Sequence, residues 1–148
     1  METEPAETQG LTFVRRLVDN HVPPSPMAEL FQTSAVAAGP GTVTLVSTPG
    51  PHAFSRAGRI HGGVMCTLLD TAIVLAAITT CAEIKSYSTV DLSVHFMRPV
   101  PAGEVTLTTH AEVLKPGSRI TFVQARSRTR TAPCWRAPRA ASSSARRG

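Results

Sequence analysis

A His-Gly-Gly turn followed by an apolar run with one carboxylate holds the residues best suited to chemistry. The turn is His61, Gly62 and Gly63, and the carboxylate is Asp70. Glycines let the backbone approach a ligand closely, and the first N–H groups of a helix have no partner inside that helix. A lone ionisable group in an apolar run is costly to bury unless it is paired or used. Backbone donors and a carboxylate base are together the parts that acyl-transfer chemistry requires.

The element that must carry these groups is a long helix, predicted over residues 62–81. The run is apolar nearly all round, which predicts burial on most sides. A membrane span is the alternative for an apolar run that approaches spanning length. Asp70 near its centre, several threonines and the lack of a second apolar segment argue against a span.

Shorter elements precede this helix. An apolar stripe at helical spacing predicts an N-terminal helix, carried by Leu11, Val14, Leu17 and Val18. We expect residues 27–31 to form a second helical turn after a proline-rich stretch. Residues 34–38 and 42–47 have the composition of two strands around a Gly-Pro-Gly turn.

Three further strands are predicted after the helix. Apolar and polar side chains alternate over residues 89–97 and 104–114, and residues 119–125 begin a third strand. Strands of this kind around one buried helix indicate the α+β class, with an antiparallel sheet wrapped around a long central helix.

The periodicity stops near the C-terminus. We expect one domain over residues 1–128 and a disordered tail rich in Arg, Ala, Ser and Pro over residues 129–148. An antiparallel meander of this type should carry one more apolar strand, so the last strand is predicted to be lost. Another reading frame through the codons of residues 132–146 can encode Leu-Leu-Ala-Arg-Ala-Ser-Ser-Ser-Phe-Leu-Val. We therefore hypothesise that the tail is a frameshift product.

Charge argues against specific nucleic-acid recognition. The net charge is +5, but seven arginines and no acidic residue follow Ala125. The first 125 residues hold 8 basic and 10 acidic side chains and carry a net charge of −2. A nucleic-acid footprint should instead lie across a folded face.

Cysteine content and the N-terminal segment indicate the compartment. The three cysteines, at positions 66, 81 and 134, are an odd number, and none has metal-ligand spacing with a histidine. Residues 1–10 lack the apolar core of a signal peptide. We expect a cytoplasmic protein with reduced cysteines, no metal and no membrane partner.

Residues 51–101 resemble the hot-dog-fold acyl-CoA thioesterases. The nearest branch is the phenylacetate-pathway (PaaI-like) type, related to the 4-hydroxybenzoyl-CoA thioesterases. Four motifs carry the resemblance: His61-Gly62-Gly63, Leu69-Asp70-Thr71-Ala72, Ser88-Thr89-Val90-Asp91-Leu92 and Phe96-Met97-Arg98-Pro99. Looser similarity extends over residues 11–125. The fold that the resemblance implies is the hot-dog fold, a sheet wrapped around a central helix.

The resemblance also implies residue roles. Asp70 matches the catalytic acid, which acts as general base or nucleophile. The Gly62 backbone N–H matches the donor to the thioester carbonyl, with Gly63 in the same turn. His61 matches the histidine that positions the thioester, and Thr89 falls where a Ser or Thr lies near the attacking water.

Two further positions concern substrate binding. Ser55 stands six residues before His61, where the family usually carries Asn or Gln, and its side chain is shorter. Arg98 could meet the phosphates of coenzyme A. No cofactor is expected because a thioester is already an activated acyl group and coenzyme A is part of the substrate.

Spacing on the helix predicts a dimer. Gly62 and Asp70 lie eight residues apart, which is about 12 Å of helix rise. One carbonyl cannot easily touch both groups on one helix. Two antiparallel helices from a C2 homodimer would bring Asp70 of one chain near Gly62 of the other. The family also forms dimers of dimers, and the sequence leaves both states open.

The function that follows is hydrolysis of a medium-chain or aryl acyl-CoA to the free acid and coenzyme A. Asp70 would activate water, and the Gly62 N–H would polarise the carbonyl. Three alternatives remain: a non-catalytic acyl-CoA-binding or regulatory hot-dog protein, an enoyl-thioester hydratase, and a poorly folding product that lacks its last strand.

Overall fold

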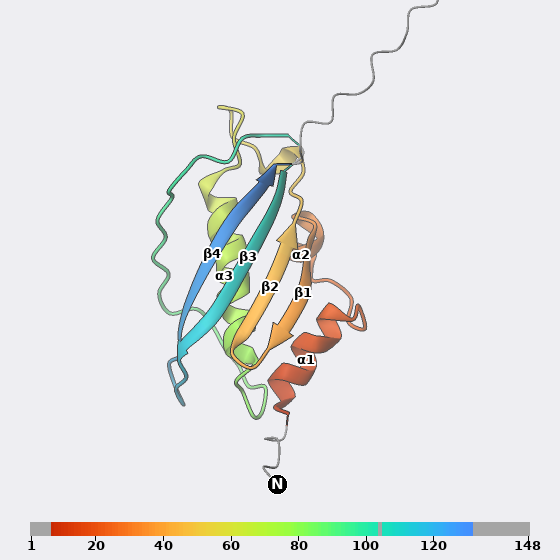
Figure 1. The fold of residues 1–148 in the computed structure, drawn as a ribbon, viewed down its shortest axis with the longest axis vertical. Helices are drawn as coiled ribbons and strands as arrows, with labels where there is room; N and C mark the ends of the chain where they lie inside the picture. Colours follow the sequence, from red (N-terminus) through yellow and green to blue (C-terminus); the bar gives the residue numbers. More distant parts are fainter. Residues whose placement is uncertain (1–6, 104, 132–148) are drawn as a thin grey trace, which may run out of the picture.

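A four-stranded antiparallel sheet forms one layer of the molecule (Figure 1). The computed structural model describes residues 7–103 and 105–131. Within them the strand order is β1-β2-β3-β4, and each neighbouring pair is antiparallel. The strands are β1 (Thr33–Gly39), β2 (Thr42–Ser47), β3 (Val105–Lys115) and β4 (Phe122–Thr131).

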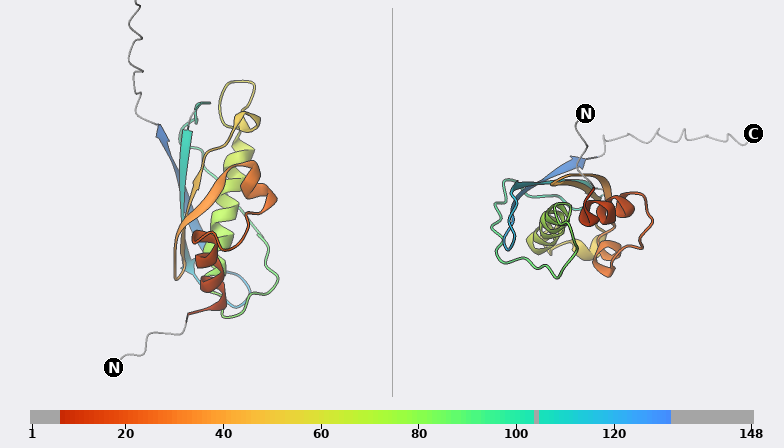
Figure 2. Two further views of the ribbon diagram at one scale, coloured as in Figure 1. Left: turned by 90° about the vertical axis from the view of Figure 1, so that its right-hand side faces the viewer. Right: turned by 90° about the horizontal axis from the view of Figure 1, so that it is seen from below.

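The helices cover one face of this sheet (Figure 2). The longest, α3 (Gly62–Ile78), lies along the sheet, with α1 (Gln9–Val18) and α2 (Pro26–Leu30) beside it. A short 3-10 turn, η1 (Pro51–Ala53), precedes α3. The sequence prediction of an antiparallel sheet on a long central helix is therefore confirmed.

A stripe of α3 facing the sheet forms the core. Its buried members recur every four residues, which places them on one side of a helix: Val64, Leu68, Ala72 and Ala76. Buried side chains of β2 and β3 complete the two clusters around this stripe, among them Val43, Leu45, Leu107 and Ala111. The expectation of burial on most sides of α3 is wrong, because the face opposite this stripe stays partly exposed.

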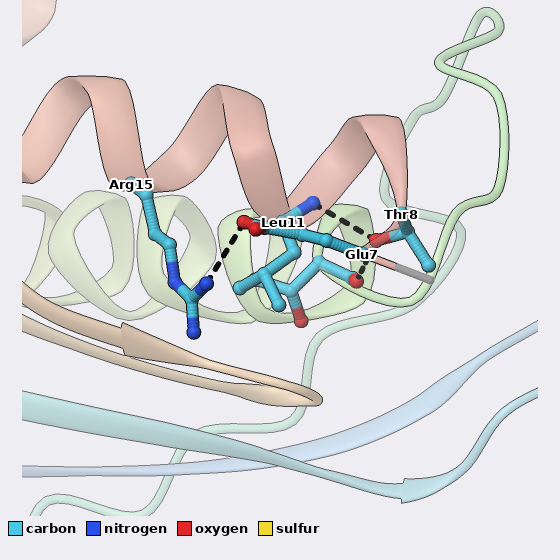
Figure 3. Close-up of polar contacts among 5 residues, drawn as sticks. Glu7, Thr8, Leu11 and Arg15 are labelled. Atoms are coloured by element: carbon cyan, nitrogen blue, oxygen red, sulfur yellow. Dashed lines mark hydrogen bonds and ion pairs between the residues drawn. The ribbon is translucent and has the colours of Figure 1, made fainter. Parts of the chain in front are cut away.

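The N-terminal helix is fixed to the end of α3. Thr8 caps α1 by accepting a 3.0 Å hydrogen bond from the Leu11 N–H, and Arg15 pairs with Glu7 at 3.0 Å (Figure 3). The Thr8 hydroxyl also donates to the Thr79 carbonyl at 2.6 Å. A Cβ at Gly10 would lie 1.7 Å from the Ile78 carbonyl oxygen. Glycine at this position therefore allows α1 to approach the backbone of α3.

The local predictions around these elements are largely confirmed. The stripe at residues 11–18 lies in α1, residues 27–31 fall on α2 and its C-cap, and the two N-terminal strands are β1 and β2. The helix predicted over residues 62–81 starts at Gly62 but ends at Ile78.

The two C-terminal strands follow the prediction in part. β3 buries alternate side chains as predicted, namely Val105, Leu107, Thr109 and Ala111. β4 starts later than predicted and continues to Thr131, three residues beyond the expected domain boundary.

The prediction of a strand over residues 89–97 is wrong. These residues form no ladder with any described strand. A strand needs a neighbour that pairs with its N–H and C=O groups. In the described sheet the outer edge of β4 stays unpaired, and the segment instead contacts α3 through Thr89 and Phe96. Alternation of side chains along a segment does not by itself assign a partner strand.

Two expectations concern regions that the structure describes only in part. Cys66 and Cys81 are free and half-buried, whereas Cys134 and the tail from Ala132 onward lie outside the described residues. The frameshift hypothesis therefore stays a prediction. No helix in the described part of the chain is long and apolar enough to cross a membrane.

Candidate active site on α3

Asp70 and Thr89 form the first half of the site. Asp70 lies in the middle of α3, on the face turned away from the sheet, and is half-buried. Thr89 belongs to the extended segment that follows α3, and its hydroxyl donates a 2.6 Å hydrogen bond to Asp70 Oδ1. This contact fixes one carboxylate oxygen and leaves Oδ2 without a hydrogen bond to the described residues. Such an oxygen can accept a proton from water.

The second half lies at the N-terminal end of α3. His61 is the N-cap, and its Nδ1 accepts a 2.9 Å hydrogen bond from the Gly63 N–H. A neutral imidazole that accepts at Nδ1 carries its proton on Nε2. The exposed His61 ring therefore presents an N–H donor at this end of the helix.

Gly62 holds the open backbone donor of this turn. The Gly63 N–H is bonded to His61, and the Val64 and Met65 N–H groups both reach the His61 carbonyl. Among the described residues the Gly62 N–H has no hydrogen-bond acceptor. A free N–H at a helix N-terminus suits an anion or a polarised carbonyl oxygen.

Phe96 lies at the site, although sequence analysis assigned this residue no role of its own. A Cβ at Gly62 would lie 3.3 Å from Phe96 Cζ, so the ring lies close against the turn. The side chain is nevertheless largely exposed, at 59%. The Phe96-Met97-Arg98-Pro99 motif was the available signal, but the contact itself depends on how the segment crosses α3.

Arg98 and Ser55 lie near the same end of α3. Arg98 is exposed and falls between Phe96, which contacts Gly62, and Val100, whose carbonyl accepts from the Ile60 N–H at 2.9 Å. The Ser55 backbone closes the turn before α3, accepting from the Gly58 N–H at 3.0 Å and donating to the Arg59 carbonyl at 2.7 Å. The Ser55 side chain makes no hydrogen bond with the described residues.

The two halves do not meet within one chain. Gly62 and Asp70 are separated by about two turns of α3, or roughly 12 Å along its axis. Three side chains are expected to act at the reacting atoms, and all of them lie on this helix or against it: His61, Asp70 and Thr89. The site in one chain is therefore split into a donor end and a carboxylate end.

The residues of the site offer acid-base and hydrogen-bonding chemistry. Within residues 7–103 and 105–131, no three His, Cys, Asp or Glu side chains gather as a metal ion would require. A carboxylate with a fixed orientation and an unpartnered backbone N–H are the groups present.

Comparison with solved structures shows a shared fold. A phenylacetic acid degradation-related protein from Ralstonia eutropha has a TM-score of 0.70 at 20% identity, over 78% of this chain and 88% of its own. A thioesterase family protein from Silicibacter pomeroyi has a TM-score of 0.65 at 26% identity, over 77% and 82% of the two chains. The predicted thioesterase-type α+β fold is thus confirmed.

Sequence comparison agrees with this assignment of the fold. Acyl-coenzyme A thioesterase 13 from Homo sapiens is 31% identical over 94 residues, as is its Pongo abelii counterpart. The match covers 63% of this chain and 65% of each relative, so it spans just under two thirds of their length. A family model described as the thioesterase superfamily matches residues 57–132, which are about half of the chain and contain both halves of the site. The chain therefore belongs to the thioesterase superfamily.

Proposed function

We propose that this protein is a cytoplasmic acyl-CoA thioesterase that hydrolyses a medium-chain or aryl acyl-CoA to the free acid and coenzyme A. The observation that carries the proposal is the Thr89–Asp70 hydrogen bond, which orients a half-buried carboxylate on the exposed face of α3. Membership of the thioesterase superfamily and the similarity to acyl-coenzyme A thioesterase 13 support the choice of substrate class.

In the proposed reaction Asp70 acts as the general base. Its free Oδ2 takes a proton from a water molecule, and the resulting hydroxide attacks the thioester carbonyl carbon. The Gly62 N–H donates to the oxygen that becomes negative, which is the role of an oxyanion hole. The tetrahedral intermediate collapses, the C–S bond breaks, and the coenzyme A thiolate leaves and takes the proton that Asp70 had removed from water. Asp70 thereby returns to its carboxylate form, and it acts as a base and not as a nucleophile because the attacking atom is the water oxygen.

The proposed active unit is a homodimer. Because Gly62 and Asp70 of one chain lie about 12 Å apart, one thioester requires Asp70 from one chain and Gly62 from the other. Antiparallel packing of the exposed α3 faces in a C2 dimer produces two such composite sites. The face is suited to this packing since its partly exposed side chains include the small residues Cys66 and Ala77.

Four residues would orient the substrate around these sites. The His61 Nε2–H would hold the thioester, and Ser55 and Gly63 would line its path at the N-terminal end of α3. Arg98 is exposed close to this end, where its charge attracts the phosphates of coenzyme A. The reaction requires no metal or redox cofactor.

The test is release of free thiol from a panel of acyl-CoA substrates by the purified protein. The Asp70→Asn variant runs in parallel, because it keeps the size of the side chain and the Thr89 contact partner but removes the base. We expect turnover by the wild-type protein and a loss of about 10²-fold or more in kcat for the variant. Binding of acyl-CoA without turnover by a well-folded wild-type dimer would instead identify a non-catalytic acyl-CoA-binding protein.

A further inference from the structure

The outer edge of β4 is open to another strand. β4 is the last strand in the order β1-β2-β3-β4 and pairs on one side only, with β3 (Figure 1). Within residues 7–103 and 105–131, no segment pairs with its other side. A free edge of this kind presents N–H and C=O groups that can pair with another extended chain. We propose that this edge binds an extended segment of another protein as an added strand, with acidic side chains at alternate positions of that segment.

Three arginines of β4 lie on one face of the sheet. Arg126, Arg128 and Arg130 occupy alternate positions, and side chains two residues apart on a strand point the same way. Ala125, between them in parity, packs against the helix-side core, so the arginines lie on the face that the helices leave uncovered (Figure 2). All three are exposed, and none forms an ion pair within the described part of the chain. The three guanidinium groups are therefore available to an acidic partner.

The spacing of these three arginines matches a partner in the extended conformation. Alternate residues of a strand are about 6.7 Å apart, and the same repeat holds in a strand added beside it. Acidic side chains at alternate positions of the partner would therefore each lie across from one arginine, and opposite charges in such cross-strand pairs are stabilising. One extended segment thus satisfies both the free backbone edge and the charged side chains.

The rest of β4 defines the other residues of the partner. On the helix side, Val123 and Ala125 pack against the core but stay half-buried. An added strand would cover them, so apolar residues between the acidic ones are favoured. At the start of β4 the uncovered face already holds a carboxylate, since the Gln124 amide donates to Glu112. The acidic residues of the partner are therefore expected across from the three arginines and not from Gln124.

Charge argues against two other occupants of this edge. An antiparallel pair of β4 strands from two copies would set their arginines side by side, and like charges directly opposite each other are destabilising. The chain after Thr131 contains four more arginines and no acidic residue, so it would meet the same repulsion. The arginines thus oppose self-association at the edge and select a partner of opposite charge.

Fluorescence polarisation of a labelled peptide tests the proposal on the full chain. The probe is Thr-Glu-Val-Glu-Val-Glu-Thr, whose glutamates alternate with apolar residues. The control is the same peptide N-methylated at its third and fourth residues, which keeps every charge but removes one N–H from each side of the extended peptide. We expect the N-methylated peptide to bind about tenfold more weakly or worse, because it cannot complete the ladder with β4.

The charge requirement is tested on the protein. A triple variant with glutamine at the three β4 arginines is expected to bind the probe about tenfold more weakly. The matched control is a triple variant that removes the same charge from exposed arginines outside β4, at Arg16→Gln, Arg56→Gln and Arg59→Gln. Its affinity is expected to stay within about twofold of wild type. A β4 variant that binds the probe as tightly as wild type would overturn the proposal.

Hydrogen exchange on the wild-type chain keeps the proposal testable if the β4 variant fails to fold. We expect the β4 amides that face away from β3 to exchange more slowly once the probe is bound, while those of β1 are unchanged. Wild-type protein that binds both peptides equally, or neither, would overturn the proposal. So would slow exchange of these β4 amides in the free protein, because the chain after Thr131 or a second copy would then already occupy the edge.

Discussion

The Thr89 hydroxyl lies 2.6 Å from Asp70 Oδ1, although 19 residues separate the two in the chain. The contact joins an extended segment with no strand partner to the exposed face of the central helix. It makes Thr89 the residue that orients the proposed base. The thioesterase superfamily model covers both residues.

Replacing Thr89 by Val is expected to lower kcat by about 10- to 100-fold, because a hydrogen bond to a charged group contributes about 1.5–3 kcal/mol. Valine has the shape of threonine but no hydroxyl. Thr89→Ser is the control, since it keeps the donor and is expected to retain most activity. Steady-state thiol release measures both. Equal kcat for Thr89→Val and wild type would remove Thr89 from the mechanism.

The Gly62 N–H can be removed without disturbing the helix. Proline is tolerated at the first helical position, and His61 already has the extended ψ of 137° that a residue before proline requires. Gly62→Pro is expected to reduce kcat by about 10²–10³-fold, which is the typical effect of removing one hydrogen-bond donor from an oxyanion hole.

The control for that variant is Gly62→Ala. Its Cβ would lie 3.3 Å from the Phe96 ring, a contact that the Cβ of proline also makes, but its N–H remains. We expect Gly62→Ala to keep much more activity than Gly62→Pro. If the two variants lose activity equally, contact with Phe96 rather than the lost donor is responsible.

The composite dimer predicts complementation between two inactive variants. In a heterodimer of Asp70→Asn and Gly62→Pro chains, one site combines an intact Asp70 with an intact Gly62, and the other site carries both changes. Random mixing should therefore recover about a quarter of wild-type activity. The measurement is thiol release after co-refolding, and each variant refolded alone is the control. A mixture no more active than its components would show that both groups act within one chain.

Core packing predicts a contrast between two leucines. Leu45 is 1% exposed in the cluster between β2 and α3, whereas Leu114 near the end of β3 is 60% exposed. Leu45→Ala should lower the free energy of unfolding by about 2–5 kcal/mol, since it leaves a cavity. Leu114→Ala removes the same atoms from solvent-exposed surface and should change it by about 0.5 kcal/mol or less. Denaturant titration of both variants measures the difference.

Most of the helices and strands, and the residue types that could react, were predictable from the sequence. Periodicity located α1 and β3, because burial of one face imposes a repeat on the side chains. Composition and the Gly-Pro-Gly turn located the β1–β2 hairpin, and the apolar run after the His-Gly-Gly turn located the start of α3. The His61-Gly62-Gly63 turn and the lone Asp70 were visible for a related reason. Polar or flexible residues within an apolar run need a structural or chemical role.

Contacts between groups distant in the chain were not predictable from the sequence. Residues 89–97 alternate like a strand, yet in the structure they contact α3 and leave the outer edge of β4 unpaired. Which surface a segment meets is a non-local property. The same crossing brings Thr89 to Asp70 and Phe96 to Gly62. It was also the structure that assigned the Gly63 N–H to His61 and left the Gly62 N–H open. Spacing along a chain gives the distance between groups on one helix, but contacts between distant segments arise only when the whole chain has packed.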